Sequence, residues 1–320
     1  NMATANQLKM LVKSHFEDNN ERFNTIALQI AAHEARLGHT NLANDIRKII
    51  ESSKNNKPRL KSIDSNLQGL FLEIYPQERL SDLVVAPQIK ERIERIIHEF
   101  TYKDKLFKHN LENRRKIMFS GNPGTGKTMT ASIIANELKL PIYVVLMDKI
   151  VTKYMGETSA KLRQIFDFIE DVPAVYLFDE FDAIGGQRGK DNEVGEMRRV
   201  LNSFLQFIER DHSDSLIIAA TNNLELLDQA LFRRFDDVIH YQLPTDNEKI
   251  QLLKNRLNGN LSKKEIKELL PELDSLSHAE INQACLDVIK TSVIYDLPIR
   301  FDLVVKTIKE RKSAYKLSAE

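Results

Sequence analysis

The stretch "FSGNPGTGKTMTASIIANEL" (residues 119–138) carries the strongest structural signal in the chain. It fits the pattern G-x-x-x-x-G-K-[ST] from Gly121 to Thr128, with an apolar run before it and an amphipathic helical pattern after it. Glycines at this spacing let successive backbone N–H groups face a phosphate at the positive end of the following helix. Lys127 would reach the β- and γ-phosphates, and the Thr128 hydroxyl would hold magnesium. The stretch therefore predicts a phosphate-binding loop between a buried strand and a helix.

Short apolar runs alternate with helical patterns on both sides of this loop, from about residue 80 to residue 245. The runs are "KIMFSG", "IYVVLM", "AVYLFDE", "SLIIAAT" and "DVIHYQL". Nearly continuous apolar runs are typical of strands that are buried on both faces. The alternation predicts an α/β fold with a parallel sheet and helices on both of its faces.

The rest of the chain is helical in pattern, and four regions are expected. Residues 1–54 hold three helical patterns, the second of which ends at Gly38, and they form an N-terminal helical module. Residues 55–77 are mostly polar, contain Pro58 and are predicted to be a linker. Residues 78–245 form the large α/β domain, and residues 246–320 form a smaller all-α domain.

Composition limits the classes of function. The 320 residues hold 46 Lys and Arg and 46 Asp and Glu, so the charge gives no support to binding along a nucleic acid backbone. The single cysteine, Cys285, excludes an intrachain disulfide framework and is typical of a reducing compartment. No apolar run approaches about 18 residues, and no signal-peptide pattern opens the chain. These features predict a cytoplasmic protein without a membrane segment.

The run "AVYLFDEFDAI" places two carboxylates at the carboxyl end of a predicted strand, where open α/β sheets bind ligands. Asp179 would hold the magnesium, directly or through water. Glu180 would orient and deprotonate an attacking water. Together with the phosphate-binding loop, the pair predicts Mg²⁺-dependent ATP hydrolysis.

These motifs carry a resemblance that covers most of the chain from about residue 78 to residue 300. "GNPGTGKT", "LFDEFDAI", "AATNN" and "LLDQALFRRFD" occur in the order and at the spacing of the AAA clade of AAA+ ATPases. The chain resembles the ATPase modules of FtsH, katanin, spastin and the proteasomal ATPases. The resemblance implies a five-stranded sheet, a helical lid domain after it, and hexameric rings with ATP at the subunit boundaries.

The resemblance also implies roles for individual residues. Asn222 is similar to the sensor that contacts the attacking water or the γ-phosphate, and Arg233 and Arg234 match an arginine-finger pair that would reach the neighbouring subunit's nucleotide. His278 stands where the family usually has glycine, and the adenine is expected against the backbone of residues 84–86. The ATP-binding set is Val85, Ala86, Asn122, Pro123, Gly124, Thr125, Gly126, Lys127, Thr128, Met129 and Ala279, with Thr128 and Asp179 as magnesium ligands.

A large apolar pair lies in "DKIVTKYMGETSAKL" (residues 148–162), where a surface loop is expected. In the resembled family, the loop after the second strand faces a central pore and carries an aromatic, a hydrophobic residue and a glycine. Tyr154, Met155 and Gly156 match this triplet, and Lys153 precedes it. A flat aromatic and a flexible thioether can contact an extended polypeptide without selecting particular side chains. Residues 185–199 are predicted to form a second pore loop.

The sequence therefore predicts an ATP-driven homo-hexamer that threads protein substrates through its pore. The N-terminal helices would recruit a partner, such as a separate protease or adaptor. Two alternatives remain at this point. A nucleic-acid-associated AAA+ motor or loader would show salt-dependent stimulation of its ATPase by DNA. A nucleotide switch that does not hydrolyse ATP would not need Glu180, Asn222 and the arginine pair.

Overall fold

The computed structural model describes residues 9–11, 13–14, 20–40, 42–46, 48, 67, 69–153, 157–184, 191–223 and 229–316. The chain divides into two compact units, residues 1–62 and residues 63–320. In the first unit, helix α2 (Asn20–Arg36) buries Ile26, Ile30 and Ala31. Gly38 follows α2 with a φ of +89°, a backbone conformation that glycine adopts readily, as expected for the residue that ends this helix.

The second unit is built on a six-stranded sheet with the order β1-β3-β4-β5-β2-β6. Five of its strands are parallel, as the alternation of apolar runs predicts, and the register pairs Ile117 with Ile218 and Phe119 with Ile239. The parallel strands are β2 (Lys116–Gly121), β3 (Ile142–Leu146), β4 (Val175–Asp179), β5 (Leu216–Thr221) and β6 (Asp237–Tyr241).

The sixth strand corrects the prediction that residues 55–77 are entirely a linker. Strand β1 (Phe71–Ile74) lies at the edge of the sheet and runs antiparallel to β3, with Phe71 opposite Val145. The ring of Phe71 packs near those of Tyr143, Phe168 and Tyr176. Burial of this aromatic side chain against the sheet anchors the segment.

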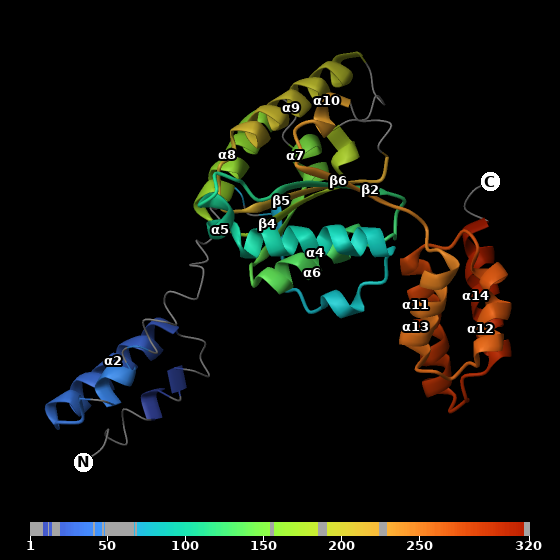
Figure 1. Cartoon of the computed structure of the whole chain (residues 1–320), viewed down its shortest axis with the longest axis horizontal. Coiled ribbons are helices and arrows are strands. Elements are labelled where there is room, and N and C mark those ends of the chain that lie inside the picture. Colours follow the sequence, from blue (N-terminus) through green and yellow to red (C-terminus); the bar gives the residue numbers. More distant parts are fainter. Residues whose placement is uncertain are drawn as a thin grey trace. The chain divides into compact units, whose positions relative to one another are not determined.

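Helices cover both faces of the sheet, and each face has its own apolar core (Figure 1). Helices α4 (Pro87–Thr101) and α6 (Lys127–Leu138) cover one face. Helices α7 (Met147–Lys153), α8 (Thr158–Asp171) and α9 (Asp191–Arg210) cover the other. The predicted second pore loop, residues 185–199, is wrong in part, because α9 already begins at Asp191. Shorter elements are η1 (Leu80–Asp82), α5 (Lys103–Phe107), η2 (Phe181–Ile184) and α10 (Gln229–Phe232).

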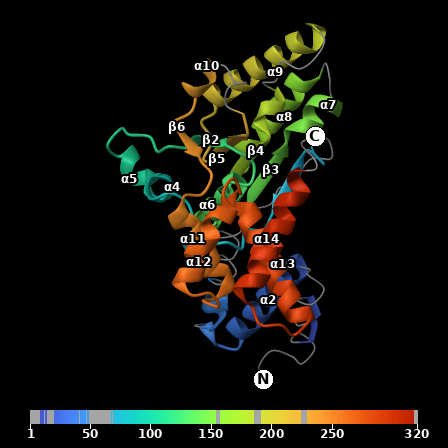
Figure 2. The ribbon, with the colours of Figure 1, turned by 90° about the vertical axis from the view of Figure 1, so that its right-hand side faces the viewer.

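The chain ends in a helical bundle with its own core (Figure 2). Its elements are α11 (Asp246–Leu257), α12 (Lys263–Leu269), η4 (Leu270–Leu273), α13 (His278–Ile294) and α14 (Phe301–Lys316). Capping boxes begin α11, α12 and α13, which satisfies backbone N–H groups that a helix start leaves free. Cys285 lies in this core, and burial raises the pKa of its thiol to about 12, as is typical of a structural cysteine. Among the described residues, no helix combines the length and apolar character needed to cross a membrane.

Candidate nucleotide site

The predicted phosphate-binding loop connects β2 to α6 at the carboxyl end of the sheet. Gly121 and Gly126 have φ values of +140° and +101°, which side chains other than glycine adopt at a cost. A Cβ atom on Gly121 would lie 2.1 Å from the carbonyl oxygen of Tyr241. These two glycines therefore determine the path of the loop, and α6 begins directly after it at Lys127.

Lys127 is only 7% exposed, and its ammonium group lies under the loop. Its Nζ donates hydrogen bonds to the carbonyl oxygens of Gly121 (2.6 Å) and Asn122 (3.0 Å) and to Oδ1 of Asn222 (2.9 Å). Burial lowers the pKa of Lys127, and the carboxylates of Asp179 and Asp182 partly oppose this effect. A phosphate group would supply the negative charge that this buried cation lacks.

Thr128 and Asp179 bring two side-chain oxygen atoms together in the lining of the groove. The Thr128 hydroxyl donates to Oδ2 of Asp179 at 2.8 Å, so two oxygen ligands from α6 and β4 already lie together. Hydroxyl, carboxylate and phosphate oxygens are the ligands that Mg²⁺ prefers. The residues fit a magnesium ion bound beside the phosphates, and the roles of Thr128 and Asp179 as its ligands stay predictions.

Glu180 follows Asp179 at the end of β4 and has a left-handed backbone, with a φ of +51°. Such a conformation in a residue other than glycine costs roughly 1–3 kcal/mol and is concentrated at functional sites. The backbone N–H of Glu180 donates to Oδ1 of Asp179 at 2.9 Å. This bond fixes the turn that places Glu180 in the lining of the groove around the phosphate-binding loop.

Asn222 is held in place by Asp182, which was not predicted to belong to the site. Oδ1 of Asp182 accepts hydrogen bonds from the backbone N–H of Asn222 and from the hydroxyl of Thr221, both at 3.1 Å. The side-chain amide of Asn222 thus faces Lys127, and its backbone N–H is held by Asp182 of η2. Asp182 stands three residues after Asp179 in "LFDEFDAI", and this proximity was its only signal in the sequence.

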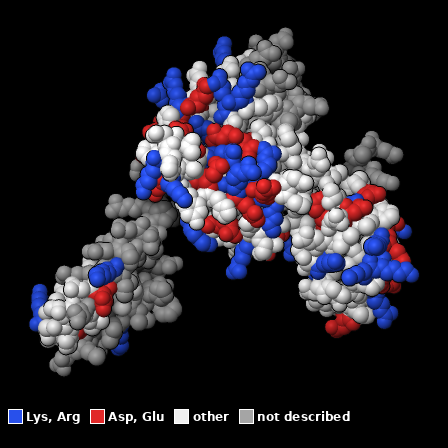
Figure 3. All heavy atoms as spheres, viewed as in Figure 1, with Lys and Arg blue, Asp and Glu red and all other residues white. Residues whose placement is uncertain are grey.

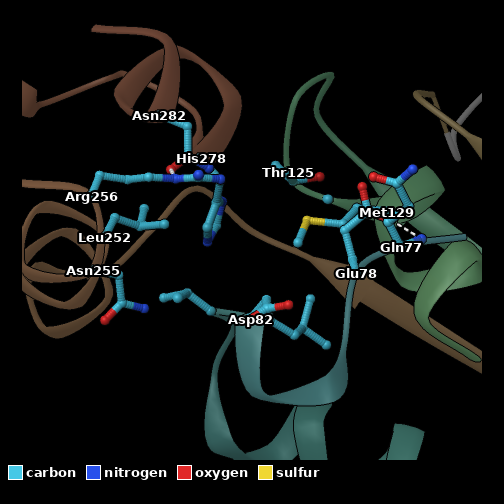
Figure 4. Close-up of a pocket in the computed structure, with 13 residues that line it drawn as sticks. Gln77, Glu78, Asp82, Thr125, Met129, Leu252, Asn255, Arg256, His278 and Asn282 are labelled. Carbon is cyan, nitrogen blue, oxygen red and sulfur yellow. Dashed lines mark hydrogen bonds between the residues drawn. The ribbon is translucent and has the colours of Figure 1, made fainter. Parts of the chain in front are cut away.

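Two hollows meet at the phosphate-binding loop. A groove of about 370 Å³ is lined by the loop, Asp179, Glu180 and Asn222, and also by Ala279 of the helical bundle. A cavity of about 490 Å³ adjoins it and extends between the loop, the segment before α4 and the helical bundle (Figure 4). Its volume suits a small organic ligand such as a nucleoside. The groove and the cavity together can hold a nucleoside phosphate.

The predicted ATP-binding residues divide among these hollows. The groove holds Pro123, Gly124, Gly126, Lys127, Thr128, Met129 and Ala279, and Thr125, Gly126 and Met129 line the cavity. The carbonyl of Asn122 accepts from Lys127 and from the Thr125 hydroxyl (2.7 Å). Val85 and Ala86 instead line a third cavity of about 260 Å³, while Val84 lines the 490 Å³ cavity. Polar residues of the latter cavity that were not predicted are Gln77, Glu78, Asp82, Asn255, Arg256 and Asn282.

The helical bundle contacts the loop directly. The backbone N–H of Ala279 donates to the carbonyl oxygen of Gly124 at 2.9 Å. A Cβ atom on Gly124, whose φ is +74°, would lie 2.5 Å from Oγ of Ser277. The start of α13 therefore packs against the loop so closely that only glycine fits at residue 124.

The remaining predicted site residues lie elsewhere or outside the described part of the chain. Arg233 and Arg234 are exposed after α10 and do not line the groove of their own subunit, and Arg234 forms an ion pair with Glu209. Lys153 is the last residue of α7. Tyr154 and Met155 lie outside the described residues, as do Gly156 and residues 185–190 of the predicted second pore loop.

Comparisons with known proteins identify relatives of the whole chain and of its α/β domain. The family described as "ATPase family associated with various cellular activities (AAA)" matches residues 117–243. An uncharacterized AAA family ATPase of Sinorhizobium fredii, y4kL, is 33% identical over 303 residues, which are 92% of this chain and 90% of that protein. The proteasome-activating nucleotidase of Methanoregula boonei is 29% identical over 238 residues, 71% of this chain and 54% of the nucleotidase. This chain thus spans about half the length of that nucleotidase.

Solved structures show the same fold. A crystal structure of the FIGL-1 AAA domain superposes with a TM-score of 0.61 at 21% identity, covering 82% of this chain and 96% of that domain. The same domain in complex with ADP gives a TM-score of 0.60 at 22% identity, covering 80% and 92%. The fold built on the six-stranded sheet and the helical bundle is therefore that of known AAA domains.

Proposed function

Since this chain belongs to the AAA family and is an ATPase, we propose that it uses Mg²⁺-dependent ATP hydrolysis to unfold or remodel protein substrates. The observation that carries the ATPase part is the convergence of Lys127, Thr128, Asp179, Glu180 and Asn222 on one groove. The part that concerns protein substrates rests on the similarity to proteasome-activating nucleotidases and on the aromatic segment after α7.

Each group in the groove has a distinct role in the proposed reaction. Lys127 neutralises charge on the β- and γ-phosphates. Thr128 and Asp179 would hold a magnesium ion, which would supply charge stabilisation in the transition state. The carboxylate of Glu180 accepts a proton from the attacking water. Asn222, supported by Asp182, holds the water or the γ-phosphate by a hydrogen bond. The groove thus brings side by side the residues to which we assign the phosphate, metal and water contacts.

We further propose that the chain acts as a homo-hexamer. Arg233 and Arg234 are exposed and do not line the groove of their own subunit. A residue that completes the site of a neighbouring subunit must be exposed in this way. The guanidinium of Arg234 pairs with Glu209 on the surface, and such an exposed pair is weak enough to exchange for a phosphate.

The proposed action in trans predicts how ATPase activity depends on assembly. The rate per subunit should rise with protein concentration, because an isolated subunit lacks the neighbour's arginines. A 1:1 mixture of wild-type and Arg234→Ala subunits should have about half of the wild-type activity, because only grooves with a wild-type neighbour are complete. A mixture with Arg210→Ala, which changes an exposed arginine on α9, should show no such loss. A rate per subunit that stays constant across the range of assembly would contradict the proposal.

Contact with the substrate is assigned to Lys153, Tyr154 and Met155, which follow α7. An aromatic ring beside a thioether provides apolar area that any extended polypeptide can contact.

The N-terminal helices are proposed to bind an adaptor or a separate protease in the cytoplasm. Acidic and basic side chains are interspersed over the face of the α/β domain shown in Figure 3, as on a surface that does not follow a nucleic acid backbone.

Crosslinking tests the proposed contact with protein. A photo-reactive amino acid at position 149, on the exposed face of α7, should capture an unfolded model protein when the subunits also carry Glu180→Gln and hold ATP. Adding Tyr154→Ala should reduce the captured fraction several-fold, whereas Tyr154→Phe should retain it, because the ring provides the contact area. Equal capture by the alanine and phenylalanine variants would contradict the assignment, and capture of DNA in place of protein would favour a nucleic-acid motor.

A further inference from the structure

His278, the first residue of α13, is a buried polar side chain without a hydrogen-bond partner. Its residue is 7% exposed, and neither Nδ1 nor Nε2 has a partner among the described residues. Oε1 of Glu248 lies 3.8 Å from Nε2, which is too far for a hydrogen bond. A buried imidazole that loses its contacts with water and gains none from the protein reduces the stability of the fold. Such a group is informative when it lies in a cavity, because a ligand can supply the missing partner.

The backbone around His278 is fixed on both sides. Ser277 caps α13 and exchanges hydrogen bonds with Glu280, whose carboxylate accepts from the Ser277 N–H at 2.6 Å. Ala279 donates its N–H to the phosphate-binding loop at Gly124. The backbone of His278 is therefore held at a set distance from the loop, and Figure 4 shows its imidazole extending from the helical bundle into the cavity that Thr125 and Met129 also line.

The position of His278 corresponds to the middle of a bound nucleotide. Only four residues line both the 370 Å³ groove and the 490 Å³ cavity in the described part of the chain, namely Gly126, Met129, His278 and Asn282. With the phosphates in the groove and the base in the cavity, the sugar lies where these two hollows meet. Gly126 has no side chain, Met129 offers a thioether, and Oδ1 of Asn282 accepts from Nε of Arg256 at 3.1 Å. His278 contributes two ring nitrogens that have no hydrogen-bond partner among the described residues.

We propose that His278 hydrogen-bonds a ribose hydroxyl of the bound nucleotide and makes the site selective for ribonucleotides over deoxyribonucleotides. A neutral imidazole has one donor and one acceptor, and each hydroxyl of the sugar can serve as either. This inference rests on the proposed binding of a nucleoside phosphate in the groove. In the proposed site Lys127, Thr128 and Asp179 would hold the phosphates and the metal, and His278 would add a residue that distinguishes the sugar.

Glu248 supports the imidazole without taking the place of the ligand. Burial alone would raise the pKa of Glu248, but the nearby His278 and hydrogen bonds from Thr245 lower it below its usual value. Its Oε2 accepts from the Thr245 N–H at 2.8 Å, so this carboxylate already serves as the capping group of α11. The carboxylate is thereby fixed 3.8 Å from Nε2, and neither ring nitrogen is occupied by a hydrogen bond to it.

Equilibrium binding without turnover tests the proposal. Isothermal titration calorimetry is carried out with ADP, 2′-deoxy-ADP and 3′-deoxy-ADP on the full chain, its His278→Ala variant and a control. The wild-type protein should bind at least one deoxy analogue about 10-fold more weakly than ADP, the loss expected for one buried hydrogen bond. His278→Ala should bind ADP about 10-fold more weakly than wild type and should no longer distinguish that analogue. His212→Ala, which changes an exposed histidine remote from the groove lining, should match the wild type.

The outcomes separate this inference from the proposed function. If the wild-type protein binds ADP and both deoxy analogues with equal affinity, His278 does not have the proposed role. This comparison uses only the wild-type protein, so it does not depend on whether a variant folds. A His278→Ala protein that loses equal affinity for all three ligands also overturns it. Melting curves of both proteins without nucleotide separate a loss of affinity from a loss of the fold. Wild-type protein that binds no ADP at all would contradict the nucleotide site itself.

Discussion

The Glu180→Gln protein is expected to bind ATP with near wild-type affinity and to hydrolyse it about 1000-fold more slowly, within the range for loss of a general base. The amide retains the size and polarity of the side chain but cannot accept a proton from water. The contacts proposed to hold the phosphates and the metal do not involve this side chain, since they are assigned to Lys127, Thr128 and Asp179. Binding is measured with a fluorescent ATP analogue, and hydrolysis is measured by phosphate release.

Glu170→Gln is the matched control, because it removes an exposed carboxylate from α8, away from the groove lining. It should hydrolyse ATP at the wild-type rate. If Glu180→Gln released phosphate at near wild-type rate, Glu180 would not be the base, and another group in the groove would have to activate the water.

Lys127→Ala should bind ATP too weakly to measure at concentrations that saturate the wild type, a loss of about 100-fold or more for a charge-assisted contact to phosphate. The substitution removes a cation that is 7% exposed and leaves no other lysine or arginine among the described residues of the groove lining. It also leaves Oδ1 of Asn222 without its donor, so the ammonium group no longer joins the loop carbonyls to the side-chain amide of Asn222. Affinity is measured by calorimetry, with magnesium present.

Lys264→Ala provides the comparison, because the Lys264 side chain is 89% exposed on α12. It should bind ATP as the wild type does. A melting curve of nucleotide-free Lys127→Ala distinguishes loss of binding from loss of the fold. ATP binding by Lys127→Ala within about threefold of wild type would show that the buried ammonium is not the phosphate contact, since charge-assisted bonds are worth more than that.

The nucleotide loop and the parallel sheet could be predicted because their signals are local. A strand, a glycine-rich turn and a helix follow one another within residues 116–138, and apolar runs identify the five parallel strands. Strand β1 carries no comparable signal. It is only four residues long, and it pairs with β3 across about 70 residues of chain, so its pairing depends on the tertiary fold. The start of α9 at Asp191 was missed because nearby glycines favoured a loop.

Side-chain positions that depend on contacts between two elements could not be predicted from the sequence pattern. Asp182 supports Asn222 across 40 residues, and this contact becomes apparent only when η2 and β5 are brought together. His278 was noted in the sequence as a departure from glycine, but its burial and unpartnered nitrogens follow from the packing of α13 against the loop. The roles of Arg233, Arg234 and Tyr154 stay predictions, because each concerns a neighbouring subunit or a substrate.

The measurement that tests the central proposal most directly is ATP-dependent unfolding of a folded fluorescent protein that carries an unstructured tail. The wild-type protein should abolish the fluorescence only when ATP and magnesium are present. Tyr154→Ala should leave the fluorescence intact while it hydrolyses ATP at the wild-type rate, because the change removes contact with the polypeptide and leaves the groove unaltered. Unfolding by Tyr154→Ala at the wild-type rate, or an active wild-type ATPase that never unfolds the tailed protein, would contradict the proposal.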